Sequence, residues 1–343
     1  MSTNFSFSFA GDDIEDEGEP NPAGAVGRPA QPPPRPASAF PVVGKPLLPP
    51  TAHSLKQMLS QLPSKIAYNL LDVYLDDGEK IQLPRRELWD VRVQLMAEDG
   101  GAGTEPGLGN HDVKTGVYEG GFKSWESSVD LVKALLSADF LTDVDVALRI
   151  IEVLQLVTLP NFILCWALHH RTGTPMLASA LFSEGELELT PKVLRAFEEF
   201  LSARNISLSF FSGAWSTEFV DLVNPDRIPL AGDDLKHGTV ILGAETIYSP
   251  FSLGAFTQTI FSLMAQERAR GHAAEALVAA KRLYFGVGGS LDDFVAKARE
   301  LGVQVVQLSE ETKGVNRGVV HCSLPPRQLY ATQSDASASG VAR

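Results

Sequence analysis

The stretch ALVAAKRLYFGVGGSLDDF, residues 276–294, passes from an apolar run through clustered glycines into a polar segment. The run 276–280 predicts a short buried strand, and residues 291–301 predict a helix. The glycines between them resemble a phosphate-binding loop, but they lack the Lys-Ser/Thr pair of a P-loop. A tight turn leading into the helix at Asp292 is therefore the favoured interpretation.

Predicted strands and helices also alternate along the rest of the chain. Helical spacing of apolar residues begins at Trp125, and Thr190 followed by Pro191 predicts the start of a helix that runs to about residue 203. Residues 253–270 predict another helix. The remaining strand candidates are residues 149–151, 206–211, 239–242 and 303–308. Strands joined by crossover helices predict an α/β fold with a mostly parallel sheet that is covered on both faces.

Composition shifts predict four regions. Residues 1–52 are acidic and rich in proline, and residues 323–343 form a polar tail; both are expected to be disordered. Residues 53–112 predict a small β-containing subdomain, with a helix at 54–62 and a hairpin around Asp77-Gly78, followed by a glycine-rich loop. Residues 113–322 form the main domain.

Charge and cysteine content limit the classes of ligand and the cellular compartment that we expect for this protein. Lys and Arg number 29 against 42 Asp and Glu, a net charge of −13, which argues against direct binding of nucleic acid. An acidic surface does attract basic proteins. Two cysteines, Cys165 and Cys322, predict reduced thiols in a cytoplasmic or nuclear protein. The most apolar stretch, residues 153–168, is too short and too polar for a membrane span.

Two predicted strands end in residues suited to ligand contact, at the edge where open α/β sheets bind ligands. FFSGAWS (residues 210–216) carries Gly213 and Trp215, and ILGAETIYSP (residues 241–250) carries Glu245. Two interpretations stay open for each. Trp215 is either a ligand-stacking ring or an ordinary half-buried aromatic residue. Glu245 is either a functional carboxylate or a carboxylate at a helix N-terminus.

A third segment, YEGGFKSWESSVDLVK (residues 118–133), joins two glycines to Trp125 at a helix start. It is either a turn with a helix that Trp125 anchors, or a flap that covers a ligand with the hydroxyl groups of Ser124 or Ser127. The seven histidines show no metal-ligand spacing, so no metal site is predicted. No Gly-x-Ser-x-Gly or Cys-His signature of nucleophilic catalysis is found.

Together these segments resemble the protein-histidine N-methyltransferases, in particular the fungal relatives of the enzymes that methylate a ribosomal large-subunit protein. FSFSFAGDDIED (residues 5–16) and LPRRELWDVRVQL (residues 83–95) are also similar to that family. The resemblance implies a Rossmann-like, seven-strand methyltransferase sheet that binds S-adenosylmethionine. It also implies a ribosomal large-subunit protein as substrate, a monomer, and a place in the cytoplasm and nucleus.

The resemblance implies site residues as well. Ser124 to Ser128 would lie over the cofactor, Gly213 and Trp215 would flank its adenine, and Ala244 and Glu245 would close its methionine end. The implied cofactor-binding set is Ser124, Trp125, Glu126, Ser127, Ser128, Gly213, Trp215, Ala244 and Glu245. Glu245 and Tyr248 are the implied catalytic residues, with Tyr248 close to the incoming substrate.

One departure from the family stands out. Its glycine-rich loop of the type Glu-Leu-Gly-Cys-Gly and its acidic strand end of the type Asp-Tyr-Asn are both missing, because Glu152 is followed directly by Val153. A parallel crossover needs at least about 10–12 residues, so one helix and one strand are deleted. Intact motifs on both sides indicate a skipped exon or a gene-model error. The neighbouring strands must close up or leave a gap.

The missing glycines and acid would have supplied close backbone contacts and a ribose anchor for the cofactor. We therefore expect this chain to bind S-adenosylmethionine poorly and to be inactive as it stands. A non-catalytic factor in ribosome assembly, whose acidic segment contacts basic ribosomal protein, is the alternative function.

Overall fold

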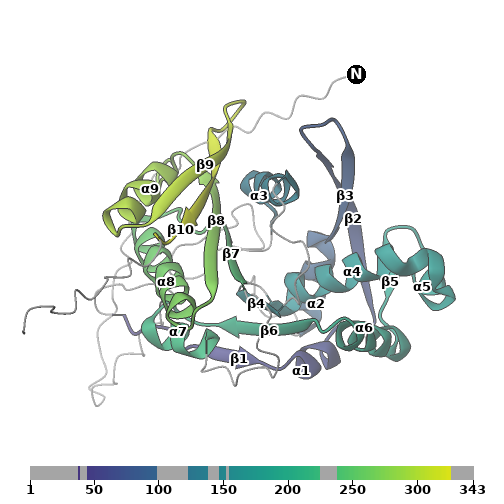
Figure 1. Cartoon of the computed structure of the whole chain (residues 1–343). Coiled ribbons are helices and arrows are strands. Elements are labelled where there is room, and N and C mark those ends of the chain that lie inside the picture. Colours follow the sequence, from purple (N-terminus) through teal and green to yellow (C-terminus); the bar gives the residue numbers. More distant parts are fainter. Residues whose placement is uncertain are drawn as a thin grey trace, which may run out of the picture. The chain divides into compact units, whose positions relative to one another are not determined.

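A computed structural model of the chain describes residue 38 and residues 45–98, 123–137, 147–151, 154–224 and 238–325. All of them lie in one unit of the chain, residues 36–343. Most of the acidic segment 1–52, the glycine-rich stretch after residue 98 and the tail after residue 325 lie outside these ranges. Figure 1 shows the described elements as coloured ribbons.

The hairpin predicted around Asp77-Gly78 is confirmed. β2 (Lys65–Tyr74) and β3 (Lys80–Arg86) pair antiparallel, and Gly78 turns the chain with a φ of 87°, a conformation that favours glycine. Short β5 (Glu186–Glu188) pairs with the other edge of β2. α1 (Leu55–Ser60) precedes this sheet, as predicted, and α2 (Leu88–Glu98) follows β3.

The most apolar part of the chain is helical. From residue 154 it forms the π-helix η1 (Leu154–Thr158) and then α4 (Leu159–His170). Leu159, Ile163 and Leu164 are fully buried, in a cluster that includes residues of α1, α5 (Pro175–Ala180) and α6 (Pro191–Ala203). The 3-10 turn η2 (Arg171–Gly173) links α4 to α5. None of the helices in the described ranges is long and apolar enough to cross a membrane.

The predicted start of α6 is confirmed in detail. Thr190 is the N-cap, and its hydroxyl oxygen accepts a hydrogen bond from the Val193 N–H at 3.3 Å. Pro191 occupies the first turn, where it costs no backbone hydrogen bond. Local capping chemistry therefore sets this boundary.

Two further sheets hold the remaining strands. The first consists, in spatial order, of β1 (Thr51–His53), β6 (Ser207–Ser212) and β4 (Ala147–Ile151). The second consists of β7 (Gly238–Ala244), β8 (Ala273–Lys281), β10 (Arg317–Ser323) and β9 (Gln304–Glu311). Three helices accompany them: α7 (Thr217–Val223) after β6, α8 (Pro250–Ala269) between β7 and β8, and α9 (Leu291–Glu300) between β8 and β9.

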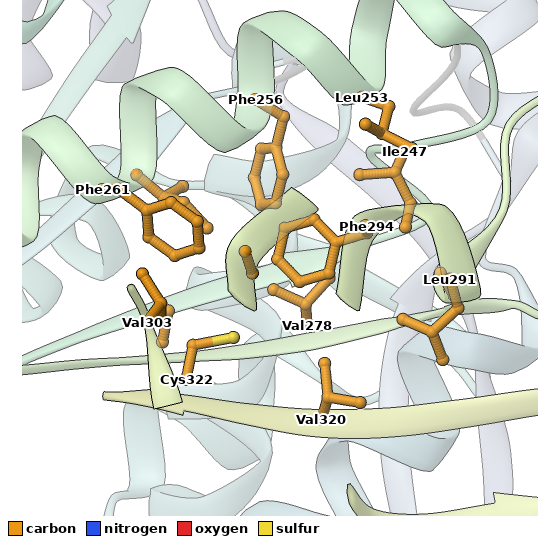
Figure 2. Close-up of a cluster of buried hydrophobic side chains, with 14 of the residues drawn as sticks. Ile247, Leu253, Phe256, Phe261, Val278, Leu291, Phe294, Val303, Val320 and Cys322 are labelled. Carbon is orange, nitrogen blue, oxygen red and sulfur yellow. The ribbon is translucent and has the colours of Figure 1, made fainter. Parts of the chain in front are cut away.

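The four-stranded sheet has a continuous hydrophobic core against α8 and α9 (Figure 2). Phe294 of α9 lies between Phe256 and Phe261 of α8, with ring centroids 6.2 and 6.1 Å apart. Val278 of β8 and Cys322 of β10 complete the floor of this core and are fully buried. Burial raises the pKa of the Cys322 thiol to about 12. Neither this thiol nor that of Cys165 forms a disulfide.

The expectation of one mostly parallel sheet is wrong for the described strands. Only β4–β6 and β7–β8 are parallel among their pairings; β10 is antiparallel to both β8 and β9. These strands do not form a single seven-strand sheet either. β4 and β7 each end their sheet with an edge that has no strand partner in the described part of the chain. The described strands are divided among three separate sheets.

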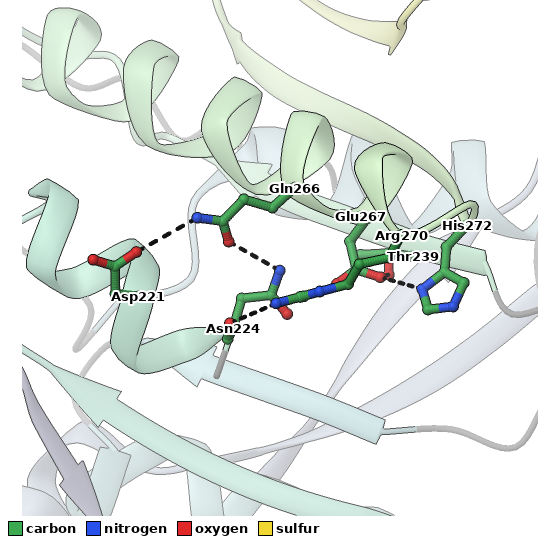
Figure 3. Close-up of polar contacts among 7 residues, drawn as sticks. All are labelled: Asp221, Asn224, Thr239, Gln266, Glu267, Arg270 and His272. Carbon is green, nitrogen blue, oxygen red and sulfur yellow. Dashed lines mark hydrogen bonds and ion pairs between the residues drawn. The ribbon is translucent and has the colours of Figure 1, made fainter. Parts of the chain in front are cut away.

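A polar network fixes the other end of the four-stranded sheet (Figure 3). The Glu267 carboxylate is almost completely buried, and it accepts hydrogen bonds from His272 Nδ1 at 2.9 Å, Thr239 Oγ1 at 3.2 Å and Arg270 Nη1 at 3.0 Å. Burial by itself raises the pKa of Glu267. Hydrogen bonds from His272, Asn224 and Thr239 outweigh that cost, so the pKa of this carboxyl group is lowered from its ordinary value.

We expect Glu267→Gln to lower the free energy of unfolding by about 1–3 kcal/mol, because charge-assisted bonds at a buried acceptor are lost. Because the folded-state pKa is lowered, this stabilisation is complete above the unfolded pKa of about 4.3 and disappears as the pH falls through the folded value. Thermal unfolding from about pH 7 down to about pH 3 measures both effects. Exposed Glu300 of α9 provides the matched control, Glu300→Gln. Equal losses in the two variants would contradict this role.

Candidate active site

Three segments meet at the carboxyl ends of β7 and β8. β7 leads into Glu245, β8 ends at Lys281 and is followed by Tyr284, and α3 (Glu126–Ser137) places Ser127 in its first turn. Apolar residues of α3 pack against one face of β8 and β10, in a cluster that contains Leu131 and Leu277. The sheet and this helix therefore position the polar side chains, and Figure 1 shows α3 in teal beside the four-stranded sheet.

Glu245 leaves the strand in an unusual backbone conformation. Its φ is 58°, in the left-handed region that non-glycine residues rarely adopt, and its N–H donates to the Ala279 carbonyl at 3.0 Å. Such strain persists where the surrounding structure holds it, often at functional sites. α8 begins only at Pro250, after the N-cap Ser249. The helix-N-terminal interpretation of Glu245 is therefore wrong.

Both oxygens of the Glu245 carboxylate accept hydrogen bonds from side chains. Ser127 Oγ donates to Oε1 at 2.5 Å, and the Tyr284 hydroxyl donates to Oε2 at 2.6 Å. Ser127 is fully buried and Tyr284 is nearly so. Burial, and then the negative charge of Glu245, raises the pKa of Tyr284 far above its ordinary value. The phenol therefore stays protonated and remains a donor at neutral pH.

Trp125 lies at the rim of this group. The Lys281 ammonium is 4.5 Å from the centroid of its ring and 5.7 Å from that of Tyr284. The Trp125 carbonyl accepts from the Ser128 N–H at 3.0 Å, which starts the first turn of α3. Ser124 and Glu126, which flank Trp125, are exposed. Of the predicted segment 124–128, Trp125 and Ser127 are thus brought to the Glu245 group.

The predicted adenine-flanking residues have other partners. A Cβ atom on Gly213 would lie 2.6 Å from the Pro50 Cα, and the Ala214 N–H donates to the Leu48 carbonyl at 3.0 Å. Gly213 thus packs closely against residues 48–50. Trp215 is partly buried against Phe256, with ring centroids 5.3 Å apart.

Ala244 and Tyr248 also contribute to packing. Ala244 packs at the margin of the cluster beneath α3. Tyr248 is 8% exposed and belongs to the hydrophobic core between α8, α9 and the sheet. Its carbonyl accepts from the Gly289 N–H at 3.0 Å, which closes the turn after β8. The prediction of a turn at residues 284–290 is confirmed, and Ser290 then caps α9.

Sequence reasoning missed two residues of this group. Tyr284 and Lys281 stand in the quoted stretch 276–294, but the glycines there drew attention to phosphate binding. Their position in the sequence could have identified them, because both follow the carboxyl end of a predicted strand that neighbours the Glu245 strand. Among the residues described, no cluster of His, Cys, Asp and Glu could hold a metal ion.

These contacts bear on whether the predicted residues fit S-adenosylmethionine. Both Glu245 oxygens are bonded within the protein, and residues 48–50 fill the space at Gly213. Only two residues separate Ile151 of β4 from Leu154 of η1, too few for a glycine-rich turn and a helix. A cavity of about 280 Å³ lies elsewhere, between α9 and β9, where Asp292 and Val305 line it. The described residues do not fit this cofactor in the predicted arrangement.

We expect Tyr284→Phe to lower the free energy of unfolding by about 1.5–3 kcal/mol, because the Glu245 carboxylate loses a charge-assisted donor. A double-mutant cycle with Glu245→Gln, measured by urea denaturation, should give a smaller loss than the sum of the single losses. Tyr74 is 59% exposed on β2, so Tyr74→Phe is the control and should change little. Additive losses in the cycle would show that the hydrogen bond contributes nothing to stability.

The amino-acid sequence is similar to yeast proteins called Histidine protein methyltransferase 1. The Schizosaccharomyces pombe protein is 29% identical over 321 residues, which cover 80% of this chain and 86% of that protein. The Saccharomyces cerevisiae protein is 32% identical over 266 residues, which cover 62% of this chain and 68% of that protein. A Bos taurus homolog of the same name is 26% identical over 64% of this chain and 58% of that protein.

No family model matches the chain. The yeast relatives nevertheless cover most of it, and both have the same name. The resemblance that the motifs indicated is confirmed: the chain belongs to the histidine protein methyltransferase family.

Proposed function

We propose that the gene's product methylates a histidine side chain in a protein of the large ribosomal subunit, with S-adenosylmethionine as methyl donor. The observation that carries this proposal is the Glu245 carboxylate, held by Ser127 and Tyr284 at the edge of the sheet where such enzymes bind their ligands. In a reaction of this kind the donor supplies a sulfonium-bound methyl group to a neutral imidazole nitrogen, and the enzyme contributes mainly positioning.

Charge and composition support the proposed partner and cellular setting. A net charge of −13 favours a basic protein as substrate over direct contact with nucleic acid. We propose a monomer that works in the cytoplasm and nucleus, where both thiols remain reduced.

The 343-residue chain itself is proposed to bind the donor weakly. Its junction at Glu152 and Val153 leaves out the glycine-rich turn and the acidic strand end. The Glu245 carboxylate is bonded to side chains of the protein itself, and residues 48–50 fill the space at Gly213. The same observation favours one alternative, a non-catalytic role in ribosome assembly. Under that alternative, a Glu245→Gln change in the gene would leave the strain like the unaltered one, whereas catalysis would make it behave like a gene deletion.

Isothermal titration of the 343-residue chain with S-adenosylmethionine should give no micromolar binding. Two or three lost hydrogen bonds, at about 1–3 kcal/mol each, weaken affinity by about two orders of magnitude or more. The Schizosaccharomyces pombe relative is the reference protein in the same titration. Micromolar binding by the 343-residue chain would show that the remaining residues suffice.

Disrupting the gene should remove a methylhistidine from the ribosomal proteins, as seen by mass spectrometry of the large subunit. Expressing the 343-residue chain in the disrupted strain should not restore it, because the cofactor contacts are missing. Sequencing the transcript across the codons of Glu152 and Val153 should then reveal an inserted in-frame segment. Unchanged methylation in the disrupted strain would refute the assignment, and restoration by the 343-residue chain would refute its inactivity.

A further inference from the structure

Large apolar side chains are exposed around the turn that follows β8. Four residues make up this group, which we call the Phe285 patch: Phe251, Leu283, Phe285 and Val287. Phe285 is 84% exposed. A Cβ atom on Gly288 would lie 3.7 Å from the ring of Pro250, so the turn lies against the start of α8, where Phe251 stands. A group of exposed apolar side chains of this kind marks an interaction site.

Backbone contacts hold this turn in one conformation. The Tyr284 N–H donates to the Gly289 carbonyl at 2.9 Å, and the Tyr284 carbonyl accepts from the Gly288 N–H at 3.1 Å. A Cβ atom on Gly289 would overlap the Ile247 carbonyl oxygen, so the turn packs directly on the segment that joins Glu245 to α8. Side chains presented by a fixed turn lose little conformational freedom when a partner covers them. The patch is therefore preorganised for binding.

The Phe285 patch borders the candidate active site. Phe285 directly follows Tyr284, whose hydroxyl donates to the Glu245 carboxylate at 2.6 Å. The chain belongs to a family of histidine protein methyltransferases, so a protein must come to this site. A protein that reaches the Glu245 group meets the turn beside it. This continuity with the site identifies the substrate protein as the partner that covers the patch.

The patch offers apolar contact and no charge. Residues 283–291 contain no charged side chain. Arg282, which precedes them, has its guanidinium in ion pairs with Asp292 and, at 3.0 Å, with Glu310. Apolar and aromatic residues form the centre of protein interfaces, where charged residues are depleted. The partner must therefore contribute apolar side chains, in addition to any basic surface that the net charge of the chain attracts.

We propose that the Phe285 patch is a docking surface for the protein substrate, which covers it with apolar side chains that flank the target histidine. The inference rests on the proposed function, because it places a protein substrate at the Glu245 group. It adds a determinant of substrate choice that net charge does not supply. Phe285 acts in it as an anchor that becomes buried in the complex and touches neither the methyl donor nor the reacting nitrogen.

Photo-cross-linking tests what covers the patch. The 343-residue chain, with p-benzoylphenylalanine in place of Phe285, is expressed in the strain that lacks the gene. A control chain has the same replacement at Phe182, which is 90% exposed just after α5. We expect position 285, and not position 182, to be linked to a protein that loses a methylhistidine when the gene is disrupted. No linked product, equal yields from both positions, or a linked protein without such a histidine would overturn the proposal.

A pair of serine variants tests the anchor. Isothermal titration with the purified linked protein should show about 10- to 100-fold weaker binding for Phe285→Ser, the contribution of one buried Phe side chain. Phe285→Leu should retain most of the affinity, and Phe182→Ser should retain all of it. Thermal unfolding should be the same in all variants, because both side chains are exposed. Equal affinity of Phe285→Ser and Phe182→Ser would overturn the proposal.

The docking surface and the proposed function fail in different ways. Unchanged histidine methylation in the disrupted strain would refute both. Lost methylation without a cross-link at position 285 would refute the docking surface alone. A linked protein that has a gene-dependent methylhistidine but is not ribosomal would support the docking surface and refute the ribosomal substrate.

Discussion

A backbone length constraint governs this structure. A chain that leaves one strand and returns parallel to it needs about ten residues or more, and two residues separate β4 from η1. No strand can be inserted there. Among the described strands β4 pairs only with β6 and β7 pairs only with β8, and the two strands belong to separate sheets.

The four-stranded part does not need the missing strand to form a core. α8 and α9 cover one face with a cluster in which Phe294, Val278 and Ala280 are fully buried, and α3 covers part of the other face. The Glu245 group depends on this half alone, because Ser127, Lys281 and Tyr284 all come from α3, β8 and the turn that follows. Its geometry therefore needs no strand pairing with the sheet that contains β4.

Local signals explain how well the elements could be predicted. The Asp77-Gly78 turn and the Thr190-Pro191 helix start were both correct, because each depends on the chemistry of adjacent residues. β10 escaped prediction, because its residues 317–323 mix Arg, Gly and His with short apolar runs. Its place between β8 and β9 depends on pairings across the sheet, which no local pattern encodes. For the same reason the sequence could indicate Glu245 and Ser127, but neither the hydrogen bond between them nor the hydroxyl group of Tyr284.

The high pKa of Tyr284 has a consequence for how this site responds to pH. Its phenol donates to Glu245, and because its pKa is raised far above the ordinary value it stays protonated near neutral pH. A titration step seen near neutral pH must therefore come from another group. The imidazole of an incoming histidine titrates in that range. The acidic limb of a pH–rate profile for this family would then report an imidazole, of the substrate or of the enzyme, and would not report the Tyr284 phenol.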